Sequence, residues 1–460
     1  MGDVSMNEGQ HKGHERSVPQ RLSFSDAAVH FANGAESPRT FLERCLDNIA
    51  AWEHDIGAFV HLDTEAARRA ADRSTERWRS GSPLSPIDGM PLGIKDIIET
   101  VDFPTGQGSP LFTGTHTHRD AASVAALRSA GAIVLGKTVT TEFAATEPRG
   151  TRNPWDLTRT PGGSSSGSAA AVATGMLSAA LGTQGIASIV RPSSFCGCIG
   201  FKPSLGGINR GGSYDTISQS CTGVLGASLS DTWQVAIEIA TRAGGDPGFP
   251  GLAGPQQMPL PAKPKAIAIV ETAGWSGATD EARAQFAKSI DSIEHRGVRI
   301  IRHHNHSAVR ALEETIINAR PLANTINAWE MRWPLNTYRD RDAAKVSLVM
   351  LERLGQAEAM TIDQYRAAIA ERENVRRLYS QLREECDACL ALAASGAAPV
   401  GLHSTGDPSF AIPFTLVGAP VISLPALHDE GLPLGLQVGG FRDQDEQTFA
   451  FAAWISANLV

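Results

Sequence analysis

The 460-residue sequence has few cysteines and no long apolar run. Six cysteines are too few for a disulfide scaffold, so we expect reduced, buried thiols. No stretch of about 18 unbroken apolar residues is present, and no transmembrane helix is predicted. Residues 1–16 lack the apolar segment of a secretory signal, and Met6 stands where N-myristoylation requires Ser or Thr. These absences predict a cytoplasmic protein that makes no membrane contact.

The sequence also lacks an excess of positive charge. Its formal net charge is -8, its pI is about 5.9 and it has no long basic run, so a surface that follows nucleic-acid phosphates is not expected. Apolar residues make up 42% and charged residues 20% of the chain, a composition typical of a soluble globular protein with a sizeable core. We therefore expect disorder only at the ends and no nucleic-acid partner.

Few residues in the sequence have the pattern of a metal site. The one CxxC pair, Cys386 and Cys389, leads into an apolar run and has no second pair at zinc spacing, which favours core packing. His303, His304 and His306 are close neighbours on an extended segment, where their side chains point in different directions and no carboxylate ligand pattern accompanies them. No metal site is expected.

The alternation of helical and strand-like segments predicts an α/β fold. Residues 19–79 have the spacing of amphipathic helices, and residues 89–229 alternate short apolar runs with glycine-rich turns and helices of small residues. Residues 306–385 are mostly helical. We predict a helix over 279–295 and buried strands over 132–135, 266–270, 298–301, 421–424 and 434–438. Without an internal repeat or a linker, residues 20–460 are expected to form one domain behind a disordered lead-in, residues 1–19.

Two local details are predicted within this pattern. A helix over 120–128 should be capped by Asp120 and ended by Gly131. Trp329 and Trp333 are four residues apart and are expected on one helix face, a spacing more typical of a packed core than of a pocket.

One segment matches the phosphate-loop pattern GxxxxGK[ST] letter for letter, namely residues 131–138. A phosphate cradle needs a preceding strand and a flexible loop whose amides point inward. Here the four loop positions are apolar and follow a helix, so Ile133, Val134 and Leu135 are expected in a buried strand. ATP binding is therefore not predicted.

A second pattern, GxSxG over residues 163–167, is that of a nucleophile elbow with Ser165 at its centre. Such an elbow must follow a hydrophobic strand, but residues 153–161 are a polar loop with two prolines. An α/β-hydrolase is thus only the second choice. No lysine has a serine three residues before it, which removes the SxxK motif of penicillin-binding proteins.

Residues 161–203 carry the strongest functional signal, because glycines and hydroxyl side chains bracket an alanine-rich helix. Packing alone does not need so many of them. Glycine and serine at the ends of helices and strands permit close backbone approach and aim N–H groups at a developing anion.

This segment resembles the amidase signature, whose usual form is GGSSGGSAA, then GTDTGGSIR or GTQTxGSxxRP, then FCGxxGxKP. Upstream, GMPLGIKD at residues 89–96 resembles the lysine motif of the same family. Downstream, residues 405–408, 416–425 and 431–437 resemble its C-terminal motifs. The resemblance covers about residues 80–230 and 405–442.

Carried over position by position, the resemblance assigns Lys95 as the base, Ser164 as a bridging serine in a cis peptide, and Ser188 as the nucleophile. A serine hydroxyl is a weak nucleophile and needs a base within hydrogen-bond reach. A buried lysine can supply one, because desolvation lowers its pKa. Ser164 would then relay the proton between Ser188 and Lys95.

The resemblance also places an oxyanion hole at the amides of Gly185, Ile186, Ala187 and Ser188. The family usually has Thr-Gly-Gly or Thr-Ala-Gly before the nucleophile, where this chain has Gly-Ile-Ala. Isoleucine is β-branched and poorly tolerates positive φ, so we expect a loop conformation or substrate opening of its own here.

Three further residues are implied to support the site: Ser165, Gln184 and Arg191. Gln184 occupies the usual Asp or Gln position, and Arg191 fits the second form of the signature. Residues 218–221 read Ser-Gln-Ser-Cys where Ser-Leu-Asp-Thr is common, which predicts different contacts around the triad.

The implied fold is a mixed, twisted central β-sheet surrounded by α-helices, with a signature core over about 80–230, a variable helical part over 235–400 and a C-terminal return to the sheet over 405–460. The implied activity is hydrolysis of the C–N acyl bond of a small-molecule amide, anilide or carbamate (urethane) through a Ser-cisSer-Lys triad and an acyl-enzyme. No cofactor is expected, and the enzyme would act as a monomer or homodimer.

Three alternatives remain. The chain could be an amidotransferase subunit that releases ammonia for a partner, an esterase that uses Ser165, or a non-catalytic binding homologue. The presence of all three triad residues argues against the last of these.

Overall fold

The computed structural model describes residues 18–459, so the expected lead-in over residues 1–19 lies almost wholly outside the described residues. The strands are β1 (Phe59–Leu62), β2 (Pro91–Lys95), β3 (Ile133–Thr138), β4 (Ala179–Gln184), β5 (Ile199–Lys202), β6 (Cys221–Gly226), β7 (Ala266–Ile269), β8 (Arg299–Ile301), β9 (Ala388–Leu392), β10 (Val421–Asp429) and β11 (Leu432–Gly439). They form one eleven-stranded sheet in the order β1-β3-β2-β4-β6-β5-β10-β11-β9-β7-β8.

The sheet is mixed. β2 pairs in parallel with β3 and β4, and β7 pairs in parallel with β8 and β9, whereas the other neighbours run antiparallel. The C-terminal strands complete its middle, because β10 pairs with β5 and β11 pairs with β9. The predicted α/β class, with a mixed central sheet and a C-terminal return to it, is confirmed.

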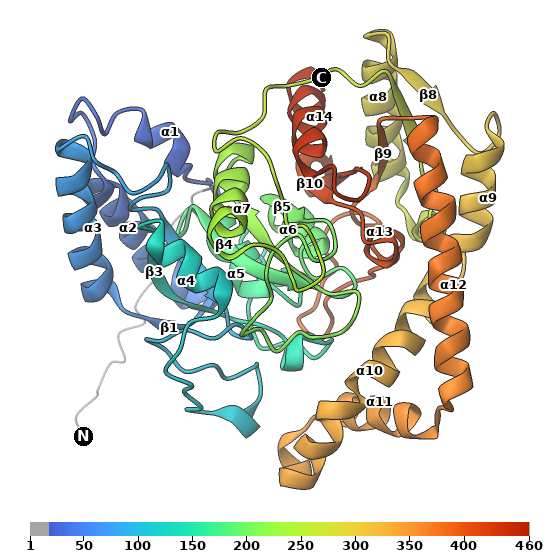
Figure 1. Cartoon of the computed structure of the whole chain (residues 1–460), viewed down its shortest axis with the longest axis horizontal. Helices are drawn as coiled ribbons and strands as arrows, with labels where there is room; N and C mark the ends of the chain where they lie inside the picture. The colour runs from blue at the N-terminus through green and yellow to red at the C-terminus, as the bar shows by residue number, and fades with distance from the viewer. Residues whose placement is uncertain (1–17, 460) are drawn as a thin grey trace, which may run out of the picture.

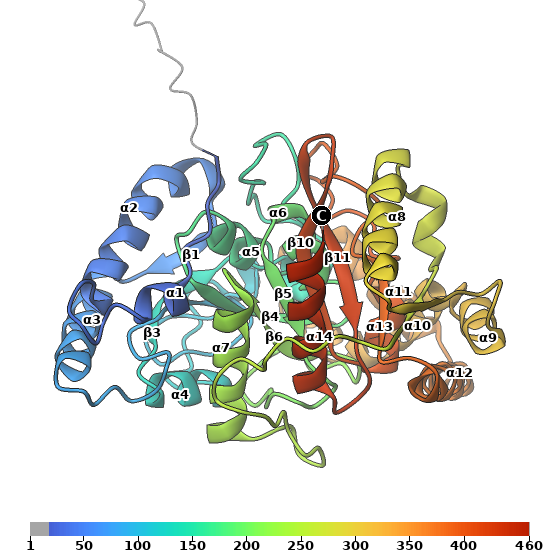
Figure 2. The ribbon, with the colours of Figure 1, turned by 90° about the horizontal axis from the view of Figure 1, so that it is seen from above.

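Fourteen α-helices surround the sheet within residues 18–459. They are α1 (Phe24–Ala28), α2 (Pro38–Ile56), α3 (Thr64–Arg79), α4 (Ala122–Ser129), α5 (Ser166–Ala173), α6 (Val190–Cys196), α7 (Leu229–Ala243), α8 (Asp280–His295), α9 (Ser307–Ile316), α10 (Ala319–Asp342), α11 (Leu348–Ala359), α12 (Ile362–Gln381), α13 (Ile412–Val417) and α14 (Asp445–Asn458). Figures 1 and 2 show α1 to α3 at one end of the molecule and α8 to α12 at the other. None of these helices is long and apolar enough to cross a membrane.

The core has two main layers, one on each face of the sheet. Strand β9 shows how the sequence builds both, because Leu390 and Leu392 belong to the buried cluster that includes residues of α8 and α14, whereas Cys389 and Ala391 belong to the cluster that includes residues of α9, α12 and α13. Successive side chains of a strand point to opposite faces, so a strand buried on both faces is a continuous apolar run. Cys386 and Cys389 are buried free thiols in the second layer, as core packing of the CxxC pair predicts.

The helix after residue 120 begins later than its predicted cap. The predicted role of Asp120 is wrong, because α4 starts at Ala122 and its N-cap residue is Ala121, without a side-chain cap. The Asp120 carboxylate instead accepts from the backbone N–H of Val101 at 2.8 Å and lies 2.9 Å from Arg128 Nε. An ion pair to the last turn of the same helix has therefore replaced the cap.

The N-terminal region is less uniformly helical than predicted. Strand β1 interrupts it and pairs antiparallel with β3 at the edge of the sheet. The strand is short and half-buried, with Val60 45% exposed, so its residues do not form the apolar run by which a buried strand is recognised.

The prediction for Trp329 and Trp333 is also wrong. Helical geometry breaks at Trp333, which precedes Pro334, and a residue before proline is disfavoured in the α region. The two side chains therefore do not share a helix face. Trp333 is 69% exposed, and Trp329 stacks on Tyr365 with ring centroids 5.3 Å apart rather than entering the core.

The residues that match the phosphate-loop pattern form a buried strand. Strand β3 includes its Gly136 and Lys137. The Lys137 ammonium donates to Ile98 O at 2.9 Å and to Thr105 Oγ1 at 2.8 Å, and lies 3.2 Å from the Asp96 carboxylate. This lysine holds the loop that follows β2, and no phosphate cradle is formed.

Gly136 has a packing reason of its own, because a Cβ there would overlap the carbonyl oxygen of His61 on β1. We predict that Gly136→Ala lowers the free energy of unfolding by about 1–3 kcal/mol, the usual cost of overpacking. The matched control is Gly355→Ala on α11, where no atom lies within 4 Å of the added Cβ and alanine is the better helix former. Urea unfolding of both variants tests this, and equal midpoints would contradict it.

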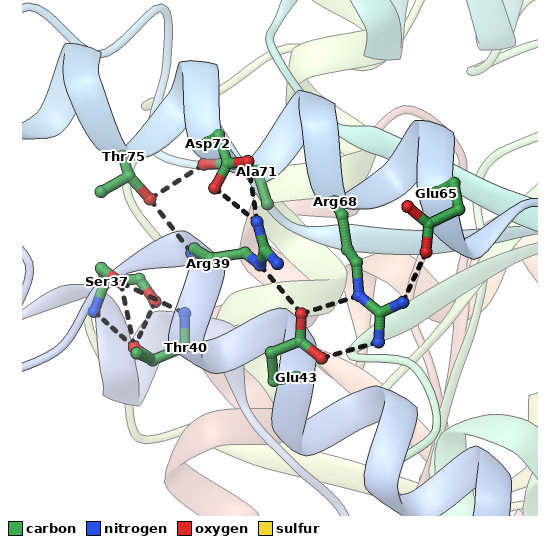
Figure 3. A network of polar contacts seen from close by, with 9 residues as sticks. All are labelled: Ser37, Arg39, Thr40, Glu43, Glu65, Arg68, Ala71, Asp72 and Thr75. Carbon is green, nitrogen blue, oxygen red and sulfur yellow. Dashed lines mark hydrogen bonds and ion pairs between the residues drawn. The ribbon is translucent and has the colours of Figure 1, made fainter.

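A polar network joins α2 to α3 (Figure 3). Glu43 accepts from Arg39 Nε at 2.8 Å and from Arg68 Nε at 2.9 Å, and Arg39 also pairs with Asp72 at 2.6 Å. The Arg68 guanidinium lowers the pKa of Glu43. These side chains are about one-third exposed or more, so solvent screens each ion pair and its contribution to stability is small. The network orients the two helices and plays no part in the site.

Candidate functional site

The ends of two neighbouring parallel strands bring the predicted site together. Lys95 is the last residue of β2, and Gln184 is the last residue of β4. The carboxyl ends of adjacent parallel strands lie at one edge of a sheet, which is where α/β folds place ligands. Ser164 precedes α5, and Ser188 lies between β4 and α6.

Lys95 is fully buried and has two hydroxyl partners. Its Nζ donates to Ser164 Oγ at 2.8 Å and to Thr183 Oγ1 at 2.9 Å. Burial lowers the pKa of Lys95 from 10.5 to about 7, and the negative charge of Asp215 opposes part of that change. A large fraction of Lys95 is therefore neutral at physiological pH and can accept a proton.

Thr183 is a hydrogen-bond partner of Lys95 that the sequence analysis missed. It directly precedes Gln184 in the signature segment, so the motif contained it without indicating a role. A neutral lysine amine has one lone pair and two N–H groups. By accepting one N–H, the Thr183 hydroxyl restricts the rotation of Lys95 Nζ and leaves the other N–H and the lone pair for the Ser164 side.

Ser164 is fully buried, and the Gly163–Ser164 peptide is cis, as the family resemblance implies. Arg191 Nη2 donates to the Gly163 carbonyl and to Thr405 Oγ1, both at 2.8 Å. Burial lowers the pKa of Arg191 to about 10, still high enough for a charged guanidinium. Arg191 thus ties the serine-rich turn to the segment near residue 405.

The loop before Ser188 is held by its carbonyl groups. Gln219 Nε2 donates to Gly185 O at 3.0 Å, and Thr415 Oγ1 donates to Ile186 O at 2.6 Å. Within the described chain, the N–H groups of all four predicted residues, Gly185, Ile186, Ala187 and Ser188, have no acceptor. Free donors gathered in one short loop are what an oxyanion hole requires.

The isoleucine in this loop does not need positive φ. Ile186 is not among the non-glycine residues of the described chain that adopt it. The concern that its β-branched side chain would strain the loop therefore does not apply. Gly185 has little room for a side chain, because a Cβ there would lie 2.5 Å from Ile217 Cδ1 and the end of that side chain would have to move.

Gln184 connects β4 to α6. Its Oε1 accepts from the backbone N–H groups of Ile189 and Val190 at 2.8 and 2.9 Å, and its Nε2 donates to Thr415 Oγ1 at 2.9 Å. Thr415 therefore contacts both the amide of Gln184 and the carbonyl of Ile186. It lies more than 200 residues along the chain from both, so no local pattern pointed to it.

Ser165, the centre of the GxSxG pattern, is fully buried. Its Oγ donates to Thr183 O at 3.4 Å, and its backbone N–H donates to Ser188 O at 3.3 Å. Residues 153–161, which precede it, form no strand of the sheet. An elbow that presents this serine to substrate is absent from the described structure, and Ser165 supports the loop of Ser188.

A cavity of about 360 Å³ opens in front of Ser188. The loop 185–188 and Arg191 line one side, residues 214–217 line a second, and side chains of α10 and α11 close the far side. Neither Lys95 nor Ser164 lines the cavity, and both are fully buried beneath its wall. Of the three predicted catalytic residues, only Ser188 lines the cavity. The volume suits a small molecule.

The histidines near residue 303 differ from expectation in one respect, since carboxylates do face them. His303 Nδ1 lies 3.1 Å from Glu313 and 3.9 Å from Glu271, and His306 Nε2 lies 3.2 Å from Glu385. Among residues 18–459, no group of three or more His, Cys, Asp or Glu side chains is arranged to hold a metal ion.

Comparison with known proteins places this geometry in a family. The chain matches the amidase family over residues 40–449. It is 32% identical to one subunit of the glutamyl-tRNA(Gln) amidotransferase of Chloroflexus aggregans (strain MD-66 / DSM 9485), over 93% of this chain and 94% of that protein. The same subunit from Salinispora arenicola (strain CNS-205) is 30% identical, over 94% of this chain and 96% of that protein.

Solved structures agree. The crystal structure of an amidase has a TM-score of 0.82 and 28% identity, and the match covers 95% of this chain and all of that one. The structure of 6-aminohexanoate cyclic dimer hydrolase, at 21% identity and a TM-score of 0.81, covers 95% of this chain and 97% of its own and shares the fold. The chain therefore belongs to the amidase signature family of enzymes, which act on carbon–nitrogen bonds.

Proposed function

We propose that this chain is a serine hydrolase that cleaves the C–N acyl bond of small-molecule amides, with Ser188 as nucleophile, Ser164 as proton relay and Lys95 as base. The observation that carries the proposal is the 2.8 Å contact between Lys95 and Ser164, fully buried beneath the cavity floor. A lysine with a pKa of about 7 in this position is matched to general-base work at neutral pH.

The steps follow from these groups. Ser188 Oγ attacks the carbonyl carbon while its proton passes to Ser164 and the Ser164 proton passes to Lys95. The N–H groups of Ile186, Ala187 and Ser188 stabilise the oxyanion of the tetrahedral intermediate. The C–N bond then breaks as the proton returns along the same path to the leaving nitrogen. Water repeats the sequence on the acyl-enzyme and releases the acid.

These steps depend only on an acyl carbonyl and a nitrogen leaving group. Amides, anilides and carbamates all supply both, so each class belongs to the proposed substrate range. The test is turnover of a panel of the three classes, with glutamine included, by the purified chain and by Ser188→Ala. Release of amine by the parent alone supports the proposal.

The second candidate is one subunit of an amidotransferase. The observation in its favour is that the two curated relatives described above are amidotransferase subunits, matched over more than nine-tenths of this chain. The same panel separates the two functions. A chain that leaves every amide intact, and releases ammonia from glutamine only when partner subunits are added, would replace the hydrolase by the transferase.

The pH dependence of kcat/KM should follow the ionisation of Lys95. Because the base must be neutral, activity should fall about tenfold per pH unit below the Lys95 pKa of about 7 and level off above it. A lysine with the ordinary value of 10.5 would give activity that still rises at alkaline pH. Initial rates on a neutral amide between about pH 5 and pH 10 distinguish the two, and a rise that continues past about pH 9 would contradict the assignment.

A further inference from the structure

Some of the charged side chains that line the cavity already have partners in the protein. Arg320 pairs with Asp407 at 2.9 Å. Glu330 accepts from Ser218 Oγ at 2.6 Å and from Tyr365 OH at 2.8 Å. Because these groups already have partners, they have less to offer a ligand.

Asp215 is different. It lines the cavity with Ser188, and it is only 9% exposed. Among residues 18–459, no side chain or backbone group donates a hydrogen bond to its carboxylate, and no cation lies within ion-pair distance. The carboxylate faces the cavity without a partner from the protein, so it can accept hydrogen bonds from a ligand.

The position of Asp215 is fixed and close to the reaction centre. The preceding residue, Tyr214, donates its N–H to Ile97 O at 3.0 Å and its hydroxyl to Glu99 at 2.8 Å. A Cβ added to Gly185 would lie 3.8 Å from Asp215 Oδ1, so the carboxylate stands beside the first residue of the oxyanion loop. The backbone that carries Asp215 is therefore anchored beside the reaction centre, by the N–H of Tyr214 and by its own N–H.

We propose that Asp215 binds a protonated amino group of the substrate, and that the preferred substrates are amides carrying such a cation near the scissile bond. This inference rests on the proposed hydrolase function and adds a substrate class to it. An ammonium group supplies both the charge and the hydrogen-bond donors that the carboxylate lacks. A neutral substrate would leave the carboxylate unpaired in the complex.

The test uses two pairs of substrates that differ by one ammonium group. The first pair places the charge on the acyl side and consists of alanine 4-nitroanilide, tested as both enantiomers, and propionyl 4-nitroanilide. The second, N-(2-aminoethyl)propionamide and N-(2-hydroxyethyl)propionamide, places it on the leaving side. For each pair, the ratio of kcat/KM is measured at neutral pH for the parent, Asp215→Asn and Arg353→Met. Arg353 lines the same cavity, so its variant changes the cavity charge in the opposite direction.

In at least one pair, the parent should prefer the cationic substrate by about 10- to 100-fold, mainly through KM, as expected for a hydrogen bond between charged groups. Asp215→Asn should abolish that preference, and Arg353→Met should not reduce it. A ratio is used because the Asp215 charge also raises the pKa of Lys95, which changes turnover of both members of a pair alike. Circular dichroism and fluorophosphonate labelling of Ser188 confirm that each variant is folded.

The outcomes separate the two proposals. Hydrolysis without preference for the cation in either pair, or a preference that survives Asp215→Asn, would overturn the role of Asp215 and leave the hydrolase intact. If the parent hydrolyses none of the four compounds or the wider panel, the hydrolase proposal fails, and the inference about Asp215 fails with it.

Discussion

Ser188→Ala should lower kcat/KM by at least about 10⁴-fold, because the variant has no nucleophile to form the acyl-enzyme and the members of a catalytic unit lose activity together. A fluorophosphonate probe that labels the parent should leave this variant unlabelled. Ser188 is the one triad residue that lines the cavity, so its removal should leave the buried Lys95–Ser164 pair in place. Kinetics and mass spectrometry of the labelled peptides measure both effects.

Ser165→Ala is the matched control. Ser165 is buried, its hydroxyl makes one long hydrogen bond of 3.4 Å to Thr183 O, and its backbone contact to Ser188 O survives the substitution. We expect a loss of less than about tenfold, in line with the modest net worth of one neutral hydrogen bond. An adduct that maps to Ser165 in the parent would instead support the nucleophile elbow.

Strand prediction succeeded for short runs rich in apolar residues, whereas the buried strands β2, β4, β5, β6 and β9 were not predicted individually. Residues 266–270, 298–301, 421–424 and 434–438 are short apolar runs, and each falls on a strand of the sheet. A short apolar run predicts a buried strand from the local sequence alone, without information about the rest of the fold. β1 escaped prediction because its residues are half-buried or exposed and form no such run.

Predictions that depended on a single side chain fared worse. Asp120 has the chemistry of a helix cap, but in the fold it is captured by Arg128 and the Val101 amide. Trp329 and Trp333 have helical spacing, but the helical backbone breaks at Trp333, directly before Pro334, so the two side chains do not share a face. In each case a competing contact or a neighbouring residue determined where the side chain lies. The spacing of residues along the sequence gives no information about such contacts.

In the site, local motifs indicated Lys95, Ser164 and Ser188, and their assignment as a catalytic triad stays a prediction. The residues that hold them were not indicated in the same way. Gln219 and Thr415 support the oxyanion loop from distant parts of the chain. Asp215 became a candidate only when the cavity and its missing partner were visible. A local motif identifies the candidate reacting groups. The residues that hold those groups in place are brought to them by tertiary packing, which the motif does not describe.

Lys95→Ala should lower kcat/KM by about 10⁴-fold, the upper range for loss of a general base, because neither Ser164 nor Thr183 can take up the proton released by Ser188. The substitution leaves a cavity in a fully buried place, which alone can cost about 2–5 kcal/mol of stability. Lys95→Met is therefore measured beside it, since methionine fills most of the volume without offering a base. Both variants should be equally inactive although their unfolding midpoints differ.

Lys288 on α8 provides the control, because it is an exposed lysine on a helix that does not line the cavity, and Lys288→Ala should keep near-parent activity. The pH profile adds a readout that a merely structural lysine would not move. In the parent, activity falls below about pH 7 as Lys95 becomes protonated, and the residual activity of Lys95→Met should lose that acidic limb because no base remains to titrate there. A folded Lys95→Met enzyme that retains near-parent turnover, or the same acidic limb, would show that another group deprotonates Ser188, and the assignment of the triad would fall.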